Sequence, residues 1–151
     1  MNILFVCTGN TCRSPMAEAL LKAMIQEGDN LAVLSGAINT LEGQPASENA
    51  VRAMAELDID LQDHRSANIN ADVLNEADLV LTMTEAHKQA IIHFFGDDFE
   101  LKTFPLLDYV GIGGDVFDPF GGDIEIYRQC RDQLKAAIAL LYEKEKAENA
   151  F

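Results

Sequence analysis

Apolar and polar positions follow two spacings along this chain, and together the spacings predict strands that alternate with helices. Short, continuous apolar runs are typical of strands that are buried on both faces of a parallel sheet. Four such runs occur, at Asn2–Val6, Leu31–Leu34, Ala77–Met83 and Leu101–Phe104. We therefore expect four strands.

Between these runs, apolar residues recur every three to four positions, which predicts amphipathic helices. Ser14 is the expected N-cap of the first helix, Pro15 suits its first position, and Gly28 follows its end. A second helix is expected from Pro45, and a third over Glu85–Phe95.

The last helix pattern is long and runs roughly from Ile124 to Lys146. Its apolar stripe, which should face the core, is Tyr127, Cys130, Leu134, Ile138 and Leu141. The charged tail after about residue 143 is expected to fray.

Strands that alternate with helices indicate right-handed crossovers and a parallel sheet covered on both faces. No linker divides the chain, so residues 1–151 are expected to form a single domain of the α/β class. We expect a three-layer sandwich with a four-stranded parallel sheet in the order 2-1-3-4. In such sheets, ligands bind beyond the carboxyl ends of the strands.

The charge of the chain limits its partners. The formal net charge is −14, from 11 basic and 25 acidic residues, and such a surface repels nucleic acid and anionic lipid. No apolar run approaches the roughly 20 residues of a membrane helix. The amino-terminal residues lack the features of a signal peptide, and three cysteines suggest neither a disulfide framework nor a zinc site. We expect a cytoplasmic monomer that binds neither nucleic acid nor membrane.

The candidate chemistry lies in "VCTGNTCRSP", residues 6–15, where the first strand ends and the first helix begins. A loop around a phosphate must point successive backbone amides inward, and Gly9 relaxes the backbone for that curl. The following helix adds free amides, and Arg13 adds a planar fork for two oxygens. The same field favours the thiolate form of Cys7, to which Ser14 can donate a hydrogen bond.

A phosphate-transfer reaction also needs a general acid for the leaving group. Asp118, in "FDPFGG", is the best candidate, because Pro119 holds it extended and the flanking glycines let the loop bend over a site. Phe120 would form an apolar wall beside the substrate. The competing interpretations are that Asp118 is an ordinary turn residue and Cys7 a buried structural cysteine.

These residues resemble the low-molecular-weight protein tyrosine phosphatase family, whose pattern is Cys-x5-Arg-Ser after the first strand and a late Asp-Pro acid loop. The resemblance covers essentially the whole chain. It implies that Cys7 attacks phosphorus, Arg13 and the loop amides hold the oxygens, and Asp118 protonates the leaving group. It implies no metal or other cofactor. The residues that it assigns to the phosphate and substrate pocket are Thr8, Gly9, Asn10, Thr11, Cys12, Ser14 and Phe120.

Details of the loop are similar to the bacterial protein arginine phosphatase branch. In tyrosine-specific members the position of Thr11 usually holds a bulky aliphatic residue, whereas a hydroxyl there meets the polar edge of a guanidinium group. The resemblance thus implies that the partners are arginine-phosphorylated proteins, with tyrosine-phosphorylated proteins as the alternative. The chain departs from the family at Ser35-Gly36-Ala37 and at Asn39-Thr40-Leu41, which leaves Phe120 as the main apolar wall.

The other cysteines and the histidines are less decisive. Cys12 is either a redox partner that forms a disulfide with Cys7, or a small buried side chain behind the loop. Cys130 is expected in the core, and the three histidines are interpreted as surface or structural residues, although His64 would lie near the active-site loops if its segment contacts them.

Two further function classes remain open. A thiol-based arsenate reductase shares this architecture but needs additional cysteines, and Cys130 is the only one beyond the loop. A phosphate-binding module would need Arg13 and the amides but not Asp118.

Overall fold

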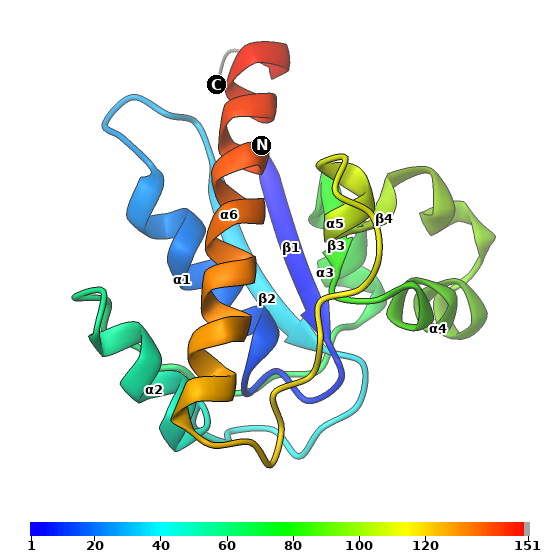
Figure 1. The fold of residues 1–151 in the computed structure, drawn as a ribbon. Helices are drawn as coiled ribbons and strands as arrows, with labels where there is room; N and C mark the ends of the chain where they lie inside the picture. The colour runs from blue at the N-terminus through cyan, green and yellow to red at the C-terminus, as the bar shows by residue number, and fades with distance from the viewer. Residues whose placement is uncertain (150–151) are drawn as a thin grey trace.

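Four parallel strands form one sheet in the order β2-β1-β3-β4, as the sequence predicts. The strands are β1 (Asn2–Cys7), β2 (Ala32–Ala37), β3 (Leu79–Thr82) and β4 (Thr103–Pro105). The structure is a computed structural model and describes residues 1–149. Because all four strands point the same way, their carboxyl ends lie along one edge of the sheet, at the lower end of β1 in Figure 1.

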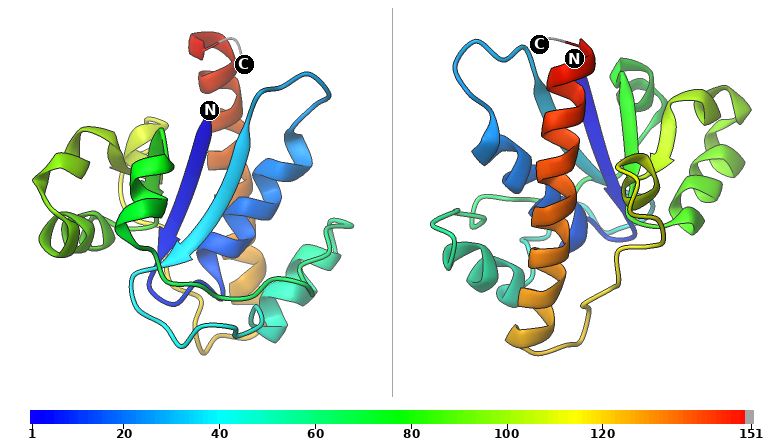
Figure 2. Two further views of the ribbon diagram at one scale, coloured as in Figure 1. Left: turned by 180° about the vertical axis from the view of Figure 1, so that it is seen from behind. Right: turned by 45° about the horizontal axis from the view of Figure 1, so that its top comes forward.

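Alternate residues of β1 enter two separate cores. Ile3 and Phe5 pack with α1 (Arg13–Met24) and α6 (Ile124–Asn149), whereas Leu4 and Val6 pack with α3 (Ala71–Glu76) and α4 (Glu85–Phe95). The two views in Figure 2 show these helix pairs on opposite faces of the sheet. The predicted three-layer α/β sandwich is therefore confirmed.

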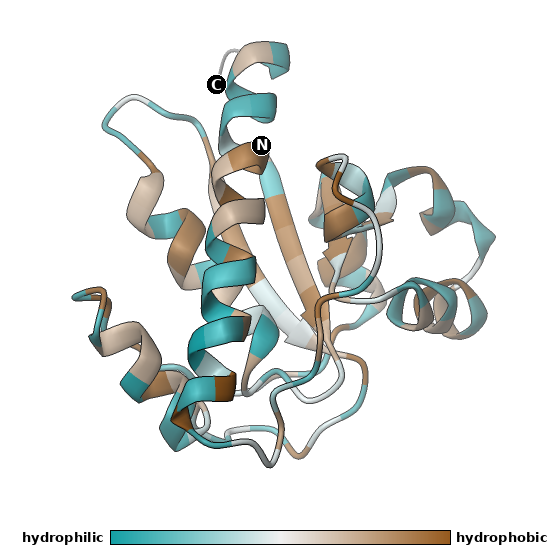
Figure 3. Ribbon diagram, in the orientation of Figure 1, coloured by the Kyte–Doolittle hydropathy of each residue, from teal (hydrophilic) through white to brown (hydrophobic). Residues whose placement is uncertain are grey.

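The remaining helices are short and lie at the borders of these layers. They are α2 (Glu48–Ala55), which packs against α6, α5 (Leu106–Tyr109), and the 3-10 helix η1 (Asp97–Lys102). Figure 3 shows β1 as mostly hydrophobic, with polar residues on several turns of α6. Within residues 1–149, no helix combines the length and the apolar character that a bilayer crossing requires.

The first two helices begin at other residues than the sequence suggests. Helix α1 begins at Arg13, so Ser14 is not its N-cap and Pro15 is not its first residue. The Ser14 hydroxyl does not cap the helix and instead contacts Cys7 Sγ. Helix α2 begins at Glu48 rather than at Pro45, and its cap is Ser47, whose Oγ accepts the amide of Ala50 at 3.4 Å.

The long carboxyl-terminal helix continues to Asn149, beyond the point at about residue 143 where fraying was expected. The reason is a buried contact near its end. Glu145 is only 1% exposed, and its carboxylate accepts a hydrogen bond from the hydroxyl of Tyr109. The predicted apolar stripe of this helix is buried along its whole length, and residues 150–151 lie outside the described residues.

Candidate active site

The loop between β1 and α1 turns back on itself beneath Cys7. Asn10 makes this reversal with a φ of 56°, a left-handed conformation that asparagine tolerates better than most residues. The sequence suggested that Gly9 would supply the unusual backbone, but Gly9 is not among the residues with positive φ. The reversal points the backbone N–H of Asn10 at Cys7 Sγ, 3.3 Å away.

Cys7 Sγ has a second polar neighbour, the hydroxyl of Ser14 at 2.9 Å. The direction of that hydrogen bond follows from Asn10. Its Oδ1 accepts the amide of Ala67, so its Nδ2 must be the donor to Ser14 Oγ at 2.9 Å. With its oxygen accepting from Asn10, Ser14 is free to donate its proton to Cys7. Two hydrogen bonds therefore converge on the sulfur.

The same asparagine holds the loop from behind. Its Nδ2 also donates to Ser35 Oγ, which in turn donates to Glu18 at 2.6 Å. The Asn10 carbonyl accepts from His64 Nε2 at 2.7 Å. The His64 segment therefore contacts the loop, and Asn10 is fully buried at the centre of this network.

Arg13 joins the loop to the segment that carries Asp118. Its Nη1 donates to the carbonyl of Val116 at 3.0 Å, and its Nη2 lies 3.7 Å from Asp118 Oδ2. Asp115 Oδ1 accepts the amide of Glu85, and the amide of Val116 donates to the carbonyl of Met83. The Asp118 loop is therefore anchored both to α1 and to the end of β3.

One open pocket of about 290 Å³ gathers most of the predicted site. Its lining residues, all of them predicted, are Cys7, Thr8, Gly9, Thr11, Cys12, Arg13, Asp118 and Phe120. The two predicted residues that do not line it, Asn10 and Ser14, lie behind the loop and act on Cys7. The volume is at the lower end of the range for small-molecule pockets, so it suits a small group rather than a large ligand.

The mouth of the pocket has one aromatic residue in its lining. Phe120 is 82% exposed there, and its amide donates to Asp118 Oδ1 at 3.1 Å. That contact fixes one carboxylate oxygen and leaves the other toward Arg13. Phe120 lines the pocket and the Asn39–Leu41 segment does not.

Cys12 is buried, and its sulfur has well-defined partners. Sγ lies 3.4 Å from Ser47 Oγ and 3.3 Å from the hydroxyl of Tyr127. Burial and the Cys12 hydrogen bond raise the pKa of Tyr127 to about 12, so its hydroxyl stays protonated. Because Cys12 is both packed behind the loop and part of the pocket lining, the structural and redox interpretations both remain compatible with its position.

Cys130 lies in the core, as predicted, with no exposed surface. Its Sγ is 3.7 Å from the carbonyl of Phe117, one residue before Asp118. Burial raises the pKa of Cys130 to about 12, so this side chain is a thiol rather than a nucleophile at neutral pH. We therefore assign Cys130 to packing beneath the acid loop.

The sequence interpretation missed the contact of His87 with the loop. His87, in the first turn of α4, places its Nε2 2.9 Å from Thr8 Oγ1. Burial, followed by the positive charge of Arg13, lowers the pKa of His87 to about 4. A signal was present, because helices that follow parallel strands begin at the edge where the ligand binds.

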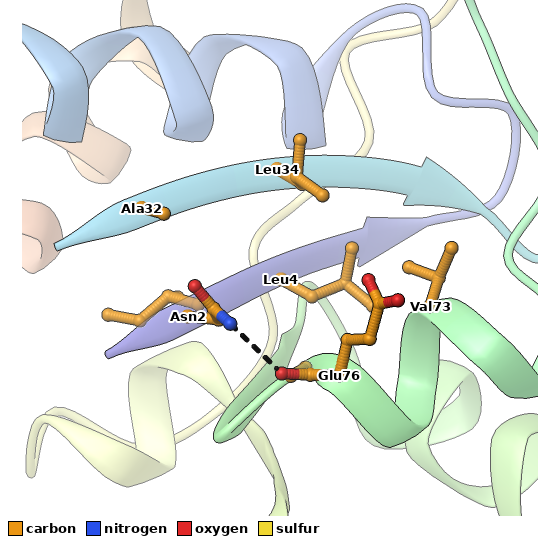
Figure 4. Close-up of a pocket in the computed structure, with 8 residues that line it drawn as sticks. Asn2, Leu4, Ala32, Leu34, Val73 and Glu76 are labelled. Atoms are coloured by element: carbon orange, nitrogen blue, oxygen red, sulfur yellow. Dashed lines mark hydrogen bonds between the residues drawn. The ribbon is translucent and has the colours of Figure 1, made fainter.

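A smaller hollow of about 110 Å³ lies at the other end of the strands (Figure 4). Leu4, Leu34 and Val73 line it, and Asn2 Nδ2 donates to the Glu76 carbonyl at its edge. It contains no group suited to phosphate chemistry. Among residues 1–149, no three His, Cys, Asp or Glu side chains are arranged to hold a metal ion.

Comparison with known proteins places these features in a family. Residues 2–150 match the model of the low molecular weight phosphotyrosine protein phosphatase family. A protein-arginine-phosphatase of Bacillus subtilis (strain 168) is 48% identical over 143 residues, 93% of this chain and 94% of that protein. The low molecular weight protein-tyrosine-phosphatase PtpB of Staphylococcus haemolyticus is 38% identical, over 93% and 97% of the two chains.

Solved structures of similar fold also include phosphatases. The YwlE arginine phosphatase from Geobacillus stearothermophilus superposes with a TM-score of 0.92 at 43% identity, covering 99% of this chain and 95% of that one. A mutant YwlE arginine phosphatase with a phosphorylated active site serine gives 0.94 at 43% identity, over 99% of each chain. This chain therefore belongs to the low molecular weight phosphotyrosine protein phosphatase family.

Proposed function

We propose that this protein hydrolyses phosphoarginine in proteins through a phosphocysteine intermediate. One observation carries the proposal: Cys7, Arg13 and Asp118 line a single open pocket that also contains the hydroxyl-bearing Thr11. The relatives named protein-arginine-phosphatase support the choice of substrate.

In the first step, Cys7 Sγ attacks phosphorus in line with the leaving nitrogen. The S–P bond forms as the P–N bond breaks, while Arg13 and the loop amides hold the phosphoryl oxygens. Asp118 gives its proton to the departing nitrogen, so that the product is an arginine side chain with an intact guanidinium group, and the phosphoryl group stays on Cys7. The position of Asp118 near Arg13 and at the mouth of the pocket supports this role.

In the second step, a water molecule attacks the phosphocysteine. Asp118, now a carboxylate, removes a proton from the water as the O–P bond forms and the P–S bond breaks. Inorganic phosphate leaves, and Cys7 returns to the thiolate, which the amide of Asn10 and the hydroxyl of Ser14 stabilise. Both steps use only residues that line or support the pocket.

The preference for phosphoarginine rests on Thr11. Thr11 lines the pocket, and its hydroxyl lies 3.8 Å from Cys12 Sγ. In this proposal the hydroxyl hydrogen-bonds to guanidinium N–H groups or to an ordered water. An isoleucine there would only pack against an apolar ring. A guanidinium group would then lose a hydrogen-bonding partner, whereas a phenyl ring would gain contact area.

The decisive experiment compares kcat/KM for phosphoarginine and phosphotyrosine peptides of the same sequence. We expect wild-type protein to prefer phosphoarginine, and Thr11→Ile to shift the ratio toward phosphotyrosine by about 10- to 100-fold. Thr11→Ser, which keeps the hydroxyl, is the matched control. Faster cleavage of phosphotyrosine than of phosphoarginine by the wild-type protein, with a ratio that Thr11→Ile leaves unchanged, would contradict the substrate assignment.

A protein-tyrosine-phosphatase activity is the second candidate. The observation that favours it is Phe120, whose exposed ring at the pocket mouth suits an aromatic substrate. A relative named protein-tyrosine-phosphatase is also 38% identical to this chain over 141 residues. The same peptide comparison decides between the two.

Two other classes fit less well. Arsenate reduction needs a second reactive thiol outside the loop, and Cys130 is buried and stays protonated. A pure phosphate-binding module has no use for the anchored Asp118 loop. An Asp118→Asn protein that binds phosphate but no longer turns over substrate would exclude the binding module.

The proposal includes arginine-phosphorylated proteins as the partners of a monomer in the cytoplasm. The acidic surface suits basic protein segments rather than nucleic acid or anionic lipid. A thiolate nucleophile beside a second thiol also suits a reducing compartment.

A further inference from the structure

We propose that neutral His87 is a positioning residue that fixes the hydroxyl of Thr8 as a hydrogen-bond donor to a phosphoryl oxygen. The inference rests on the proposed phosphatase function and adds to it a side-chain donor in a pocket otherwise described by backbone amides and Arg13. Thr8 follows Cys7 directly and lines the same pocket.

The geometry places the two side chains in contact across elements that are far apart in sequence. Thr8 Oγ1 lies 2.9 Å from His87 Nε2, and 79 positions separate the residues. Thr8 itself is exposed, whereas His87 is only 7% exposed. The histidine is held in place by its helix, because Thr84 Oγ1 caps the His87 amide at 3.1 Å. The buried His87 ring therefore limits the orientation of the Thr8 hydroxyl.

The other ring nitrogen decides the direction of the hydrogen bond. His87 Nδ1 is buried and has no hydrogen-bond partner among the described residues. A proton on Nδ1 would leave a buried donor unpaired, and orphaned buried N–H groups are rarer than underused acceptors. The proton therefore belongs on Nε2, which donates to Thr8 Oγ1. The Thr8 proton is then free to point into the pocket.

The surroundings keep the ring neutral. Burial disfavours the imidazolium form, and so does the charge of Arg13, whereas Asp115 and Asp118 favour it less strongly. These opposing contributions leave the pKa of His87 near 4. A neutral ring with one N–H can serve as a fixed donor throughout the neutral pH range.

A hydrogen bond from the Thr8 hydroxyl to a charged phosphoryl oxygen should have a measurable effect on phosphate affinity and on kcat/KM. Hydrogen bonds to charged groups contribute about 1.5–3 kcal/mol, or roughly 10- to 150-fold in affinity or kcat/KM. We expect Thr8→Val, which keeps the shape and removes the hydroxyl, to lose this factor. His87→Leu should lose most of it without touching the pocket lining, and His87→Gln should recover part of it because its Nε2 can donate from a similar place.

The experiment is a double-mutant cycle read by two measurements. Calorimetry gives the affinity for inorganic phosphate, and steady-state kinetics gives kcat/KM for a phosphoarginine peptide. The expected result is non-additivity: the Thr8→Val/His87→Leu double variant should bind phosphate as Thr8→Val alone does. His93→Leu, an exposed change in the same helix, is the matched control and should leave both values unchanged.

A second measurement needs no variant and therefore survives if His87→Leu fails to fold. Nitrogen-15 NMR of the wild-type protein should show His87 neutral, with its proton on Nε2, from pH 5.5 to 8. An Nδ1–H tautomer, or strictly additive losses in the cycle, would overturn the proposal. If Thr8-dependent phosphate binding is found but no phosphoarginine turnover, only the proposed function fails.

Discussion

The guanidinium Nη2 of Arg13 lies 3.7 Å from Oδ2 of Asp118. The group that would hold the phosphoryl oxygens and the group that would donate the proton are therefore neighbours, although 105 positions separate them in the sequence. Arg13 also donates to the backbone of the acid loop at Val116. In the proposed mechanism, one side chain thus both binds the anion and places the acid beside it.

Replacing Asp118 with asparagine should remove proton donation and leave phosphate binding. We expect kcat for a phosphoarginine peptide to fall by about 10²- to 10⁴-fold, the range for a positioned general acid. The loss should be smaller for nitrophenyl phosphate, whose leaving group needs less protonation. Steady-state kinetics with both substrates checks this, and equal losses would argue against Asp118 as the acid.

Asn10→Ala should destabilise the whole protein and not only its activity. The change removes the hydrogen bonds of Asn10 with the Ser14 and Ser35 hydroxyls and with the Ala67 amide, and it puts alanine at a φ of 56°. We expect the free energy of unfolding to fall by about 3 kcal/mol in urea titrations. Asn39→Ala, an exposed change, is the control and should alter it by less than about 0.5 kcal/mol.

His87 should make stability depend on pH in a defined window. Its pKa falls from 6.5 to about 4 on folding, so the unfolded state binds the proton more tightly. The contribution of neutral His87 to the free energy of unfolding is complete above pH 6.5. It is lost as the pH falls toward 4, by about 3 kcal/mol in total. Urea unfolding of wild type and His87→Gln at several pH values isolates this contribution. The difference between the two proteins should vary with pH, and a constant difference would contradict it.

Cys130 should be inert in the folded protein. Its burial and the raised pKa predict that iodoacetamide at pH 8 labels Cys7 and leaves Cys130 unmodified. Peptide mass spectrometry measures the label at each position, and the same reaction in urea should label all three cysteines. Labelling of Cys130 at a rate similar to Cys7 would show that the core opens there.

The end of α6 should contribute to stability. A chain that stops at residue 143 loses Glu145 and leaves the partly buried hydroxyl of Tyr109 without its acceptor. We expect the free energy of unfolding to fall by about 2 kcal/mol, with a lower melting temperature by calorimetry. A chain that stops at Asn149 is the control, and equal stability of the two truncated chains would support the expectation of a frayed tail.

The structure differs from the sequence expectations mainly at polar side chains that can form hydrogen bonds with more than one partner. Ser14 has the residue type and position of an N-cap, but its hydroxyl faces Cys7 and Asn10 instead. Glu145 lies within a charged run typical of a fraying helix, yet it is buried and accepts a hydrogen bond from Tyr109, 36 positions earlier. In both cases the deciding partner is in another part of the chain, which local patterns do not reveal.

The sequence by itself determined the alternation of strands and helices and the residues of the loop between the first strand and the first helix, because these follow from short-range spacing and from residue types that suit one chemistry. Only the tertiary structure decided that Asn10 rather than Gly9 turns the loop, that Arg13 reaches Asp118, and that His87 contacts Thr8. The physical reason is that a hydrogen bond depends on distance and direction in space. Folding brings together residues that no spacing along the chain relates.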